Sequence, residues 1–372
     1  MVRKAKRKTK VMNEVAFVNG EPWFSYSGAD CDVVVSTRVR LARNLANFLF
    51  PADDMEDEID RVQTLIFDSF SKLDNPDDFH MVSVGKLDAF GMKILSERGV
   101  LDADVPSGIV MRNDGRVSCR VNSVDHVRIA AFEPGLNCAH ALAECRAVDE
   151  NLQRTLQFAA SYEFGYLTAA LQDAGSGMKI AIRAHLPSLS FAGEAESIFN
   201  QIREKGLSVS SVFGAGDDWG TSLGSYYDIA TTSSINGSEF DQMASIESAG
   251  RYLVETERKF RSKCAENKPT AVHNLILRSF ASAKFSVFLT LRETVAVVSA
   301  IKWGLDMGIV QGIADSELCA LLYRVQNGHL EFLLKNGKFT FEEDIRGDMQ
   351  KKIERLRALI VQESFENIRF VS

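Results

Sequence analysis

The spacing of apolar residues changes along the chain, and each spacing predicts a different element. Short apolar runs, or apolar and polar residues in strict alternation, predict β-strands. Such patterns occupy residues 32–36, 117–121, 127–132, 178–184 and 207–212. Because only a short turn-like link separates the second segment from the third, we expect these two strands to be neighbours.

Longer segments with helical spacing separate the strands and fill the end of the chain. One helix is predicted to begin at Ser238, whose hydroxyl can cap it, with Asp241 three residues later. Its apolar face then comprises Phe240, Met243, Ile246, Leu253 and Phe260. After about residue 268 the strand pattern fades, and residues 289–335 and 341–362 are predicted to be helical.

These patterns predict an α+β domain followed by a smaller helical domain. The 372 residues agree with two domains of roughly 150 residues or somewhat more. We assign residues 1–19 to a basic disordered tail, 20–265 to the α+β domain and 266–372 to the helical domain. The boundary is expected in the polar stretch 264–270.

Composition restricts the class of protein. With 45% hydrophobic and 25% charged residues, the chain resembles ordinary globular proteins. No apolar run approaches the roughly 18 residues of a membrane span, and no apolar core follows the basic start as in a secretory signal. We therefore expect a cytoplasmic protein without membrane association. The six cysteines form no C-x-x-C pair, which favours free thiols over disulfides or a zinc site.

Charge is distributed unevenly. The net charge is −7, but the first ten residues carry six basic side chains and no acid, so the remainder carries −13. The tail could contact nucleic acid or an acidic partner, although a solvated tail is the simpler interpretation. An acidic body argues against broad contact with a phosphate backbone, so nucleic acid is not an expected partner.

The first candidate site follows directly after an apolar strand. If Ser36-Thr-Arg-Val-Arg is extended, Ser36, Arg38 and Arg40 project from one face. Two adjacent arginines repel unless an anion or acidic partners lie between them. An anion site and a surface ladder of ion pairs are both consistent with this segment.

A second candidate lies in Asn122-Ser-Val-Asp-His-Val-Arg. In an extended strand Val124, His126 and Arg128 would share a face, although an isolated histidine such as His126 is more often a core residue. The chain has no Walker A sequence and no strand-linked G-x-G-x-x-G. The glycine-rich stretch 214–220 is most simply a turn.

Together these segments resemble the phosphagen (ATP:guanido) kinase family, and most closely its bacterial protein arginine kinase branch. Residues 121–129 are similar to the family's N-E-E-D-H-L-R-I segment, and residues 165–177 to G-Y-L-T-x-C-P-x-N-x-G-T-G. Further similarity covers residues 23–44, 227–229, 253–258, 278–280 and 326–330. The resemblance implies an antiparallel sheet flanked by helices and transfer of the γ-phosphoryl group of Mg-ATP to a guanidinium. The phosphates, rather than protein ligands, would hold the Mg²⁺.

On the nucleotide side the resemblance implies an incomplete set of cations. Arg38, Arg40 and Arg128 match three family arginines, the fourth falls on Lys179, and the fifth falls on Phe213. The expected nucleotide-binding residues are Ser36, Thr37, Arg38, Arg40, His126, Arg128, Lys179 and Asp218. A further family histidine aligns loosely with Gly99.

On the acceptor side the expected chemistry is missing. The tandem family glutamates fall on Ser123 and Val124, the second of which would be the catalytic carboxylate, and the family cysteine falls on Ala170. Asp125 and Glu163 are retained, as is His126. In a regular strand, however, Asp125 would face away from Val124, and its use as a replacement would need a bulge.

The helical end resembles the R-D-x-x-R-A segment that binds phosphoarginine in protein arginine kinases. Glu354 and Arg357 match its acid and second arginine, but the first arginine is absent. The alternative, an amphipathic helix with charged outer positions, is favoured over a working phosphoarginine pocket.

We therefore expect a protein arginine kinase homologue that is a pseudokinase or a strongly weakened kinase with a regulatory role in protein quality control. The alternative is an active protein arginine kinase that uses rearranged acidic groups. By resemblance, the expected partners are a second copy bound through the helical end, a zinc-containing activator protein and an AAA+ protease chaperone.

Overall fold

The computed structural model describes residues 22–51, 56–101, 106–214, 222–234 and 237–371, so the proposed tail lies outside the described residues. Its main sheet has eight antiparallel strands in the order β2-β3-β4-β5-β1-β8-β10-β9. The strands are β1 (Val34–Arg43), β2 (Phe79–Ser83), β3 (Gly108–Arg112), β4 (Val117–Val121), β5 (Val127–Pro134), β8 (Met178–His185), β9 (Leu207–Ser211) and β10 (Tyr226–Thr231). The α+β prediction is confirmed, and β4 and β5 are neighbours as expected.

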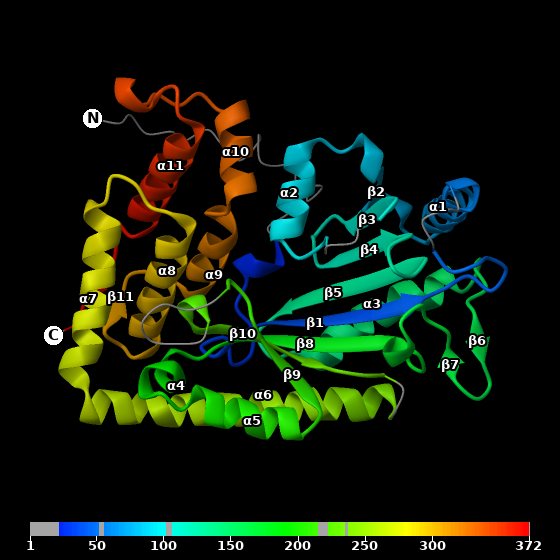
Figure 1. Cartoon of the computed structure of the whole chain (residues 1–372), viewed down its shortest axis with the longest axis horizontal. Helices are drawn as coiled ribbons and strands as arrows, with labels where there is room; N and C mark the ends of the chain where they lie inside the picture. The colour runs from blue at the N-terminus through cyan, green and yellow to red at the C-terminus, as the bar shows by residue number, and fades with distance from the viewer. Residues whose placement is uncertain (1–21, 52–55, 102–105, 215–221, 235–236, 372) are drawn as a thin grey trace.

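Helices cover one face of this sheet (Figure 1). Helix α3 (Cys138–Leu152) packs on β1 and β5, and α6 (Glu239–Asn267) packs on β8 and β10. The same face carries the apolar positions of the strands, including Val39 and Leu41 of β1, which are fully buried. The polar positions of the alternating pattern therefore point to the other face.

The remaining helices of the first part of the chain lie around the sheet. They are α1 (Glu56–Ser71), α2 (Ala89–Glu97), α4 (Pro187–Ala192) and α5 (Ala195–Glu204). A small hairpin of β6 (Ala160–Ser161) and β7 (Gly165–Tyr166) projects beside the ends of β1 and β8 (Figure 1). Strands β2, β3 and β10 and helices α1 and α2 were not predicted individually.

The predicted cap of the longest helix is confirmed. Ser238 Oγ accepts a hydrogen bond from the Asp241 N–H at 3.2 Å, and the Asp241 carboxylate accepts one from the Ser238 N–H at 2.8 Å. This reciprocal pair satisfies two backbone donors at the start of α6. The helix then continues through Cys264 to Asn267, so the polar stretch expected to mark the domain boundary is largely helical.

Five helices form the C-terminal part, which stands at one end of the sheet (Figure 1). They are α7 (Pro269–Phe285), α8 (Leu291–Asp306), α9 (Asp315–Arg324), α10 (Asn327–Asn336) and α11 (Met349–Ser364), with a two-stranded ladder of β11 (Val310–Gln311) and β12 (Arg369–Phe370). Their apolar core also takes in Val35 of β1 and Tyr226 of β10. The helical part is therefore packed directly against the sheet. The division at residue 265 stays a prediction.

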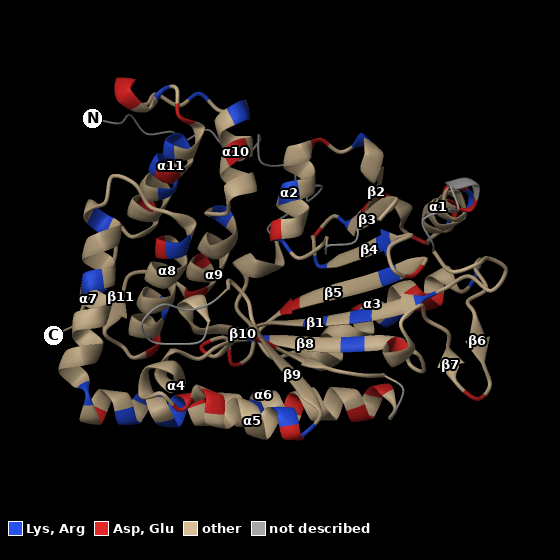
Figure 2. Ribbon diagram, viewed as in Figure 1, with Lys and Arg blue, Asp and Glu red and all other residues tan. Residues whose placement is uncertain are grey.

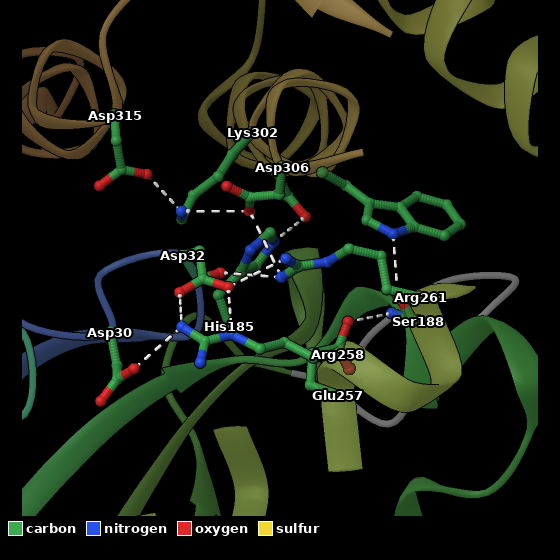
Figure 3. Close-up of polar contacts among 12 residues, drawn as sticks. Asp30, Asp32, His185, Ser188, Glu257, Arg258, Arg261, Lys302, Asp306 and Asp315 are labelled. Atoms are coloured by element: carbon green, nitrogen blue, oxygen red, sulfur yellow. Dashed lines mark hydrogen bonds and ion pairs between the residues drawn. The ribbon is translucent and has the colours of Figure 1, made fainter. Parts of the chain in front are cut away.

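A buried ionic network joins the two parts (Figure 3). Asp32, just before β1, accepts a hydrogen bond from Arg261 of α6 at 2.9 Å, and Arg261 also lies 3.9 Å from Asp306 of α8. Lys302, which is 1% exposed, lies 3.3 Å from Asp306 and pairs with Asp315 of α9. Burial raises the pKa of Asp306 to about 7, so its charged form depends on these cations.

Candidate functional site

Basic side chains gather on the face of the sheet opposite α3 and α6. Arg40 of β1 is paired in register with Lys179 of β8, and Arg120 of β4 is paired with Arg128 of β5. Arg38 lies two residues before Arg40, on the same face. Figure 2 shows basic positions on β1, β5 and β8 in the middle of the sheet. We call Arg38, Arg40, Arg120, Arg128 and Lys179 the cation cluster.

The structure brings together four of the cations expected from the sequence and adds Arg120; that they bind nucleotide stays a prediction. Arg120 is 5% exposed and was not predicted as part of the site. The alternation of β4 could have revealed it, because Val117, Cys119 and Val121 take the apolar face and leave Arg120 on the other one.

The cations of the cluster interact electrostatically. Burial, together with the charges of Arg128 and Arg38, lowers the pKa of Arg40 to about 10. Burial and the charge of Arg40 likewise lower the pKa of Lys179. Concentrated positive charge of this kind on a half-buried face attracts polyvalent anions such as phosphates.

The Asp173 carboxylate opposes these charges. Asp173 Oδ2 lies 3.7 Å from Arg40 Nη2 and 3.9 Å from Arg128 Nη2, and Asp173 is 8% exposed. The sequence analysis did not single out Asp173. The available signal was its position in residues 165–177, where the family motif has asparagine.

A cavity of about 280 Å³ lies at the Arg38 end of the cluster. Strand residues Ser36 and Arg38 line it together with Gly99, Phe213 and Tyr323. The Arg38 guanidinium lies 5.9 Å from the centroid of Phe132, which forms part of the same wall. Three of the segments that line the cavity, those of Arg38, Gly99 and Phe213, are ones that the resemblance assigned to the nucleotide side. Helix α9 of the C-terminal part also lines it and contributes Tyr323.

Phe213 gives one wall of this cavity an apolar character. It packs edge-to-face on Tyr226, with ring centroids 5.5 Å apart. Near it, Arg183 of β8 donates to Asp228 of β10 at 2.8 and 3.0 Å. The Asp228 carboxylate therefore compensates the Arg183 charge. Arg183 consequently does not replace the arginine that the family has at the position of Phe213.

Thr37 does not belong to this site, and the prediction that it binds nucleotide is wrong. Alternation in β1 turns Thr37 to the face covered by α3. There its Oγ1 donates to the Gly135 carbonyl at 2.7 Å and accepts from the Asn137 N–H at 3.0 Å, and the residue is 0% exposed. Ser36, its neighbour, lines the cavity, and its binding of nucleotide stays a prediction.

The segment between β4 and β5 is a tight bend rather than an extended strand. Asn122 has φ of 50°, β5 begins only at Val127, and the Ser123 N–H donates to the Asp125 carbonyl at 3.1 Å. The predicted common face of Val124, His126 and Arg128 is therefore wrong. Val124 points outward and is 37% exposed, whereas Asp125 is 0% exposed.

The bend brings Asp125 inward and engages both of its carboxylate oxygens. Oδ2 accepts from Arg128 Nε at 3.0 Å. Oδ1 accepts from Asn44 Nδ2 at 2.9 Å and from the Ala169 N–H at 2.8 Å. Asp125 thus reaches the cation cluster, as the bulge considered above would require, but its oxygens are occupied by structural donors.

His126 has a structural role in the same bend. It is 3% exposed, its Nδ1 accepts from the Leu45 N–H at 3.1 Å, and its own N–H donates to Asn44 Oδ1 at 2.9 Å. Burial lowers the pKa of His126, which favours the neutral ring that such an acceptor requires. His126 therefore joins the end of β1 to the bend and does not line the 280 Å³ cavity.

Of the other acceptor-side positions that the structure describes, Ser123 and Ala170 carry no carboxylate. Ser123 is buried, and Ala170 has only a methyl side chain, with its carbonyl accepting from Thr168 Oγ1 at 2.7 Å. Glu163 lies at the exposed tip of the β6–β7 hairpin. Asp218 lies outside the described residues. Over the part of the chain that the structure describes, no three His, Cys, Asp or Glu side chains are placed to hold a metal.

Arg357 is an internal tether of the helical part. It is 0% exposed and donates to the carbonyls of Val325 at 2.9 Å and Leu289 at 2.8 Å, and to Asn327 Oδ1. The prediction of an outer position is thus wrong for Arg357. Glu354 is half-buried and accepts from Gln350 at 2.8 Å. Three guanidinium nitrogens are already bonded within the protein, which leaves little capacity for a phosphoarginine.

Two protein families match successive parts of the chain. The family described as "ATP:guanido phosphotransferase, C-terminal catalytic domain" matches residues 61–260, and the "Protein-arginine kinase McsB C-terminal domain" matches residues 269–370. A protein-arginine kinase of Syntrophomonas wolfei is 27% identical over 325 residues, covering 85% of this chain and 88% of that protein. One of Bacillus velezensis is 26% identical over 315 residues, covering 83% and 86%.

Solved structures show the same fold at lower identity. The duplicated taurocyamine kinase of Schistosoma mansoni, with bound transition-state-analogue components, matches with a TM-score of 0.56 and 18% identity over 70% of this chain and 39% of that one. Lombricine kinase matches with a TM-score of 0.54 and 17% identity over 66% and 73%. Among the described residues, no helix has the length and apolar character that crossing a membrane requires.

Proposed function

The chain belongs to the ATP:guanido phosphotransferase family, and on that premise we propose that it is a protein-arginine-kinase homologue with severely weakened or absent kinase activity. It would bind the polyphosphate of Mg-ATP through the cation cluster and act as a regulatory protein in protein quality control. The similarity of both parts of the chain to protein-arginine kinases supports this assignment.

The observation that carries the proposal is the bend between β4 and β5. A guanidinium holds its proton with a pKa above about 12, so the attacking nitrogen needs a carboxylate to orient it and accept that proton. The bend presents Val124 to solvent where the family has this carboxylate. The adjacent Asp125 has both oxygens bonded to Arg128, Asn44 and Ala169.

The size of the expected defect follows from two losses. Loss of a general base typically slows a reaction by about 10²–10⁴-fold. Loss of an arginine on the transferring phosphoryl group, here Phe213, typically costs about 10³–10⁵-fold. The two losses act on one catalytic unit and need not multiply, but either alone would make transfer slow.

Purified protein, γ-labelled Mg-ATP and an arginine-rich acceptor test the proposal. We expect no acid-labile label above the level of the Arg128→Ala variant, together with a rise in melting temperature at millimolar Mg-ATP. Arg251→Ala, which removes an exposed arginine of α6, is the matched control and should keep that rise. Label that the wild type incorporates and Arg128→Ala does not would refute the loss of activity. Absence of any thermal shift would refute nucleotide binding.

An active protein arginine kinase is the second candidate. The observation in its favour is that two carboxylates, Asp125 and Asp173, lie at the cation cluster, 3.0 Å and 3.9 Å from Arg128. In an active enzyme one of them would have to release its arginine and turn to the acceptor nitrogen. The labelling experiment separates this candidate from the first.

Assembly and location form part of the same proposal. Exposed apolar side chains at the end of α7 and after it, Phe285 at 82% and Val287 at 53%, support a homodimer formed through the helical part. Light scattering on the wild type and on a Phe285→Ser variant tests this, and a monomeric wild type would contradict it.

From the family resemblance we also propose a cytoplasmic location and two partners, a zinc-containing activator protein and an AAA+ protease chaperone. Co-purification with each partner would test the last two.

A further inference from the structure

Asp173 is held in place by the loop that carries it. The loop connects β7 to β8, and Asp173 ends a 3₁₀ turn (Leu171–Asp173), with its N–H donating to the Ala170 carbonyl at 2.9 Å. Just before Asp173 in the loop, the Ala169 N–H donates to Asp125, and the Gln172 carbonyl accepts from the Ser234 N–H at 2.8 Å. The carboxylate is thus positioned beside Arg40 and Arg128 by backbone contacts that do not depend on its charge.

Asp173 acts on the charges that a polyphosphate would need. Its negative charge raises the pKa of both Arg40 and Lys179, against the lowering caused by burial and by neighbouring cations. It therefore stabilises the cluster in the absence of a ligand. An incoming phosphate must approach the guanidinium groups of Arg40 and Arg128, and the negative charge of Asp173 beside them repels it.

We infer that Asp173 is an internal counter-anion that occupies part of the phosphate-binding face of the cation cluster and weakens the binding of polyphosphate anions. This inference rests on the proposed nucleotide site and adds a determinant of its affinity. The family motif has asparagine at this position, a side chain of nearly the same shape without the charge. The change from amide to carboxylate would turn a neutral group of the site into a competitor of its ligand.

The expected effect is large enough to measure. Two like unit charges about 4 Å apart near a protein surface repel by several times the thermal energy, and the repulsion falls with distance and salt. Because a phosphate oxygen would lie somewhat farther from Asp173 than this, we expect removal of the charge to tighten binding by about tenfold.

Isothermal titration with ADP and with inorganic tripolyphosphate, at 50 and 300 mM salt, tests the inference on the full chain. Asp173→Asn should bind both anions about tenfold more tightly than the wild type, and the gain should shrink at high salt. Glu150→Gln removes one exposed negative charge of α3 and should leave affinity unchanged. Asp173→Ser serves as a second neutral variant if the asparagine variant does not fold, as judged by circular dichroism.

The outcomes separate this inference from the function on which it rests. If only Asp173→Asn binds the two anions, or if it binds them more tightly than the wild type does, the result supports both the counter-anion role and nucleotide binding. Equal or weaker binding by the neutral variants, with measurable binding by the wild type, refutes the counter-anion and leaves nucleotide binding intact. Lack of binding by every variant refutes both. Loss of phosphoryl transfer in Asp173→Asn at unchanged affinity would identify Asp173 as a catalytic carboxylate and overturn the inference.

Discussion

Two adjacent residues, Val124 and Asp125, illustrate how one local bend sets the chemistry of this protein. The bend exposes the valine and buries the aspartate, whose oxygens accept three hydrogen bonds at 2.8 to 3.0 Å. A carboxylate whose oxygens are held by several donors can turn to a substrate only by breaking those hydrogen bonds. The aspartate that retains the charge is therefore used for structure, and the valine at the position where the resemblance expects the catalytic carboxylate lacks a charge.

Restoring the missing groups should restore chemistry. In a Val124→Glu/Phe213→Arg variant we expect acid-labile phosphate incorporation into an arginine-rich acceptor to rise by about 10²-fold or more over the wild type, because a base and a phosphoryl-contacting cation each contribute at least that much in comparable enzymes. Since Val124 is partly exposed, the Val124→Glu substitution by itself should leave the melting temperature nearly unchanged.

The matched control for this pair is Val124→Gln/Phe213→Arg, which has a similar side-chain volume and no carboxylate. Because this control lacks only the base, its activity should stay at least about 10²-fold below that of the glutamate variant. Equal activity in the glutamate and glutamine variants would show that the β4–β5 bend is not the acceptor side of the site.

At the scale of elements, contacts between α2 and α10 connect the sheet part to the helical part beside the cavity. Glu97, at the end of α2, accepts from the Gly328 N–H at 2.7 Å, at the start of α10. A carboxylate at a helix N-terminus satisfies backbone donors and complements the helix dipole. His329 follows directly, is 8% exposed, and has its pKa lowered to about 4 by burial and by the charges of Arg98 and Arg324.

This histidine should make the protein sensitive to acid. Between about pH 6.5 and pH 4 the unfolded chain binds a proton at His329 that the folded chain does not, so the free energy of unfolding falls as the pH is lowered, by up to about 3 kcal/mol from this group. In His329→Gln that part of the decline should disappear. Urea unfolding at pH 7, 5.5 and 4.5 measures it.

His273→Gln changes an exposed histidine of α7 and is the control. It should follow the wild-type pH dependence. If His329→Gln and the wild type lost stability in parallel from pH 7 to pH 4.5, the buried neutral histidine would be ruled out as a source of acid sensitivity.

At the scale of the whole molecule, the sheet and the C-terminal helices are joined by buried charge as well as by apolar packing. Lys302 of α8 compensates Asp306 and Asp315, and Arg261 of α6 links Asp306 to Asp32 beside β1 (Figure 3). Removing one member of a buried network leaves its partners uncompensated, which costs more than the intact network contributes. The cavity, which has walls from both parts, depends on this junction.

Lys302→Met should therefore reduce the free energy of unfolding by about 3–5 kcal/mol, measured by urea denaturation at pH 7.5. Adding Asp306→Asn should recover part of the loss, because the second substitution removes one of the two uncompensated carboxylates. Lys351→Met, at an exposed position of α11, is the control and should change stability by less than about 0.5 kcal/mol. A loss below about 1 kcal/mol in Lys302→Met would contradict the importance of the network.

The sequence by itself determined the features that repeat with a local period. Alternation placed Arg38 and Arg40 on one face of β1, the capping residues marked the start of α6, and the motifs indicated the family. These features depend on residues a few positions apart, because the geometry of a strand or of a helix turn fixes which side chains share a face.

Only the tertiary structure decided which groups meet. The inward turn of Asp125, the place of Asp173 between Arg40 and Arg128, and the burial of Arg357 each depend on partners distant in sequence. A regular strand pattern even predicted the wrong side for Asp125, because a positive φ at Asn122 replaces alternation with a bend. Whether a charge serves chemistry or structure is set by the donors around it, and those come from the folded chain.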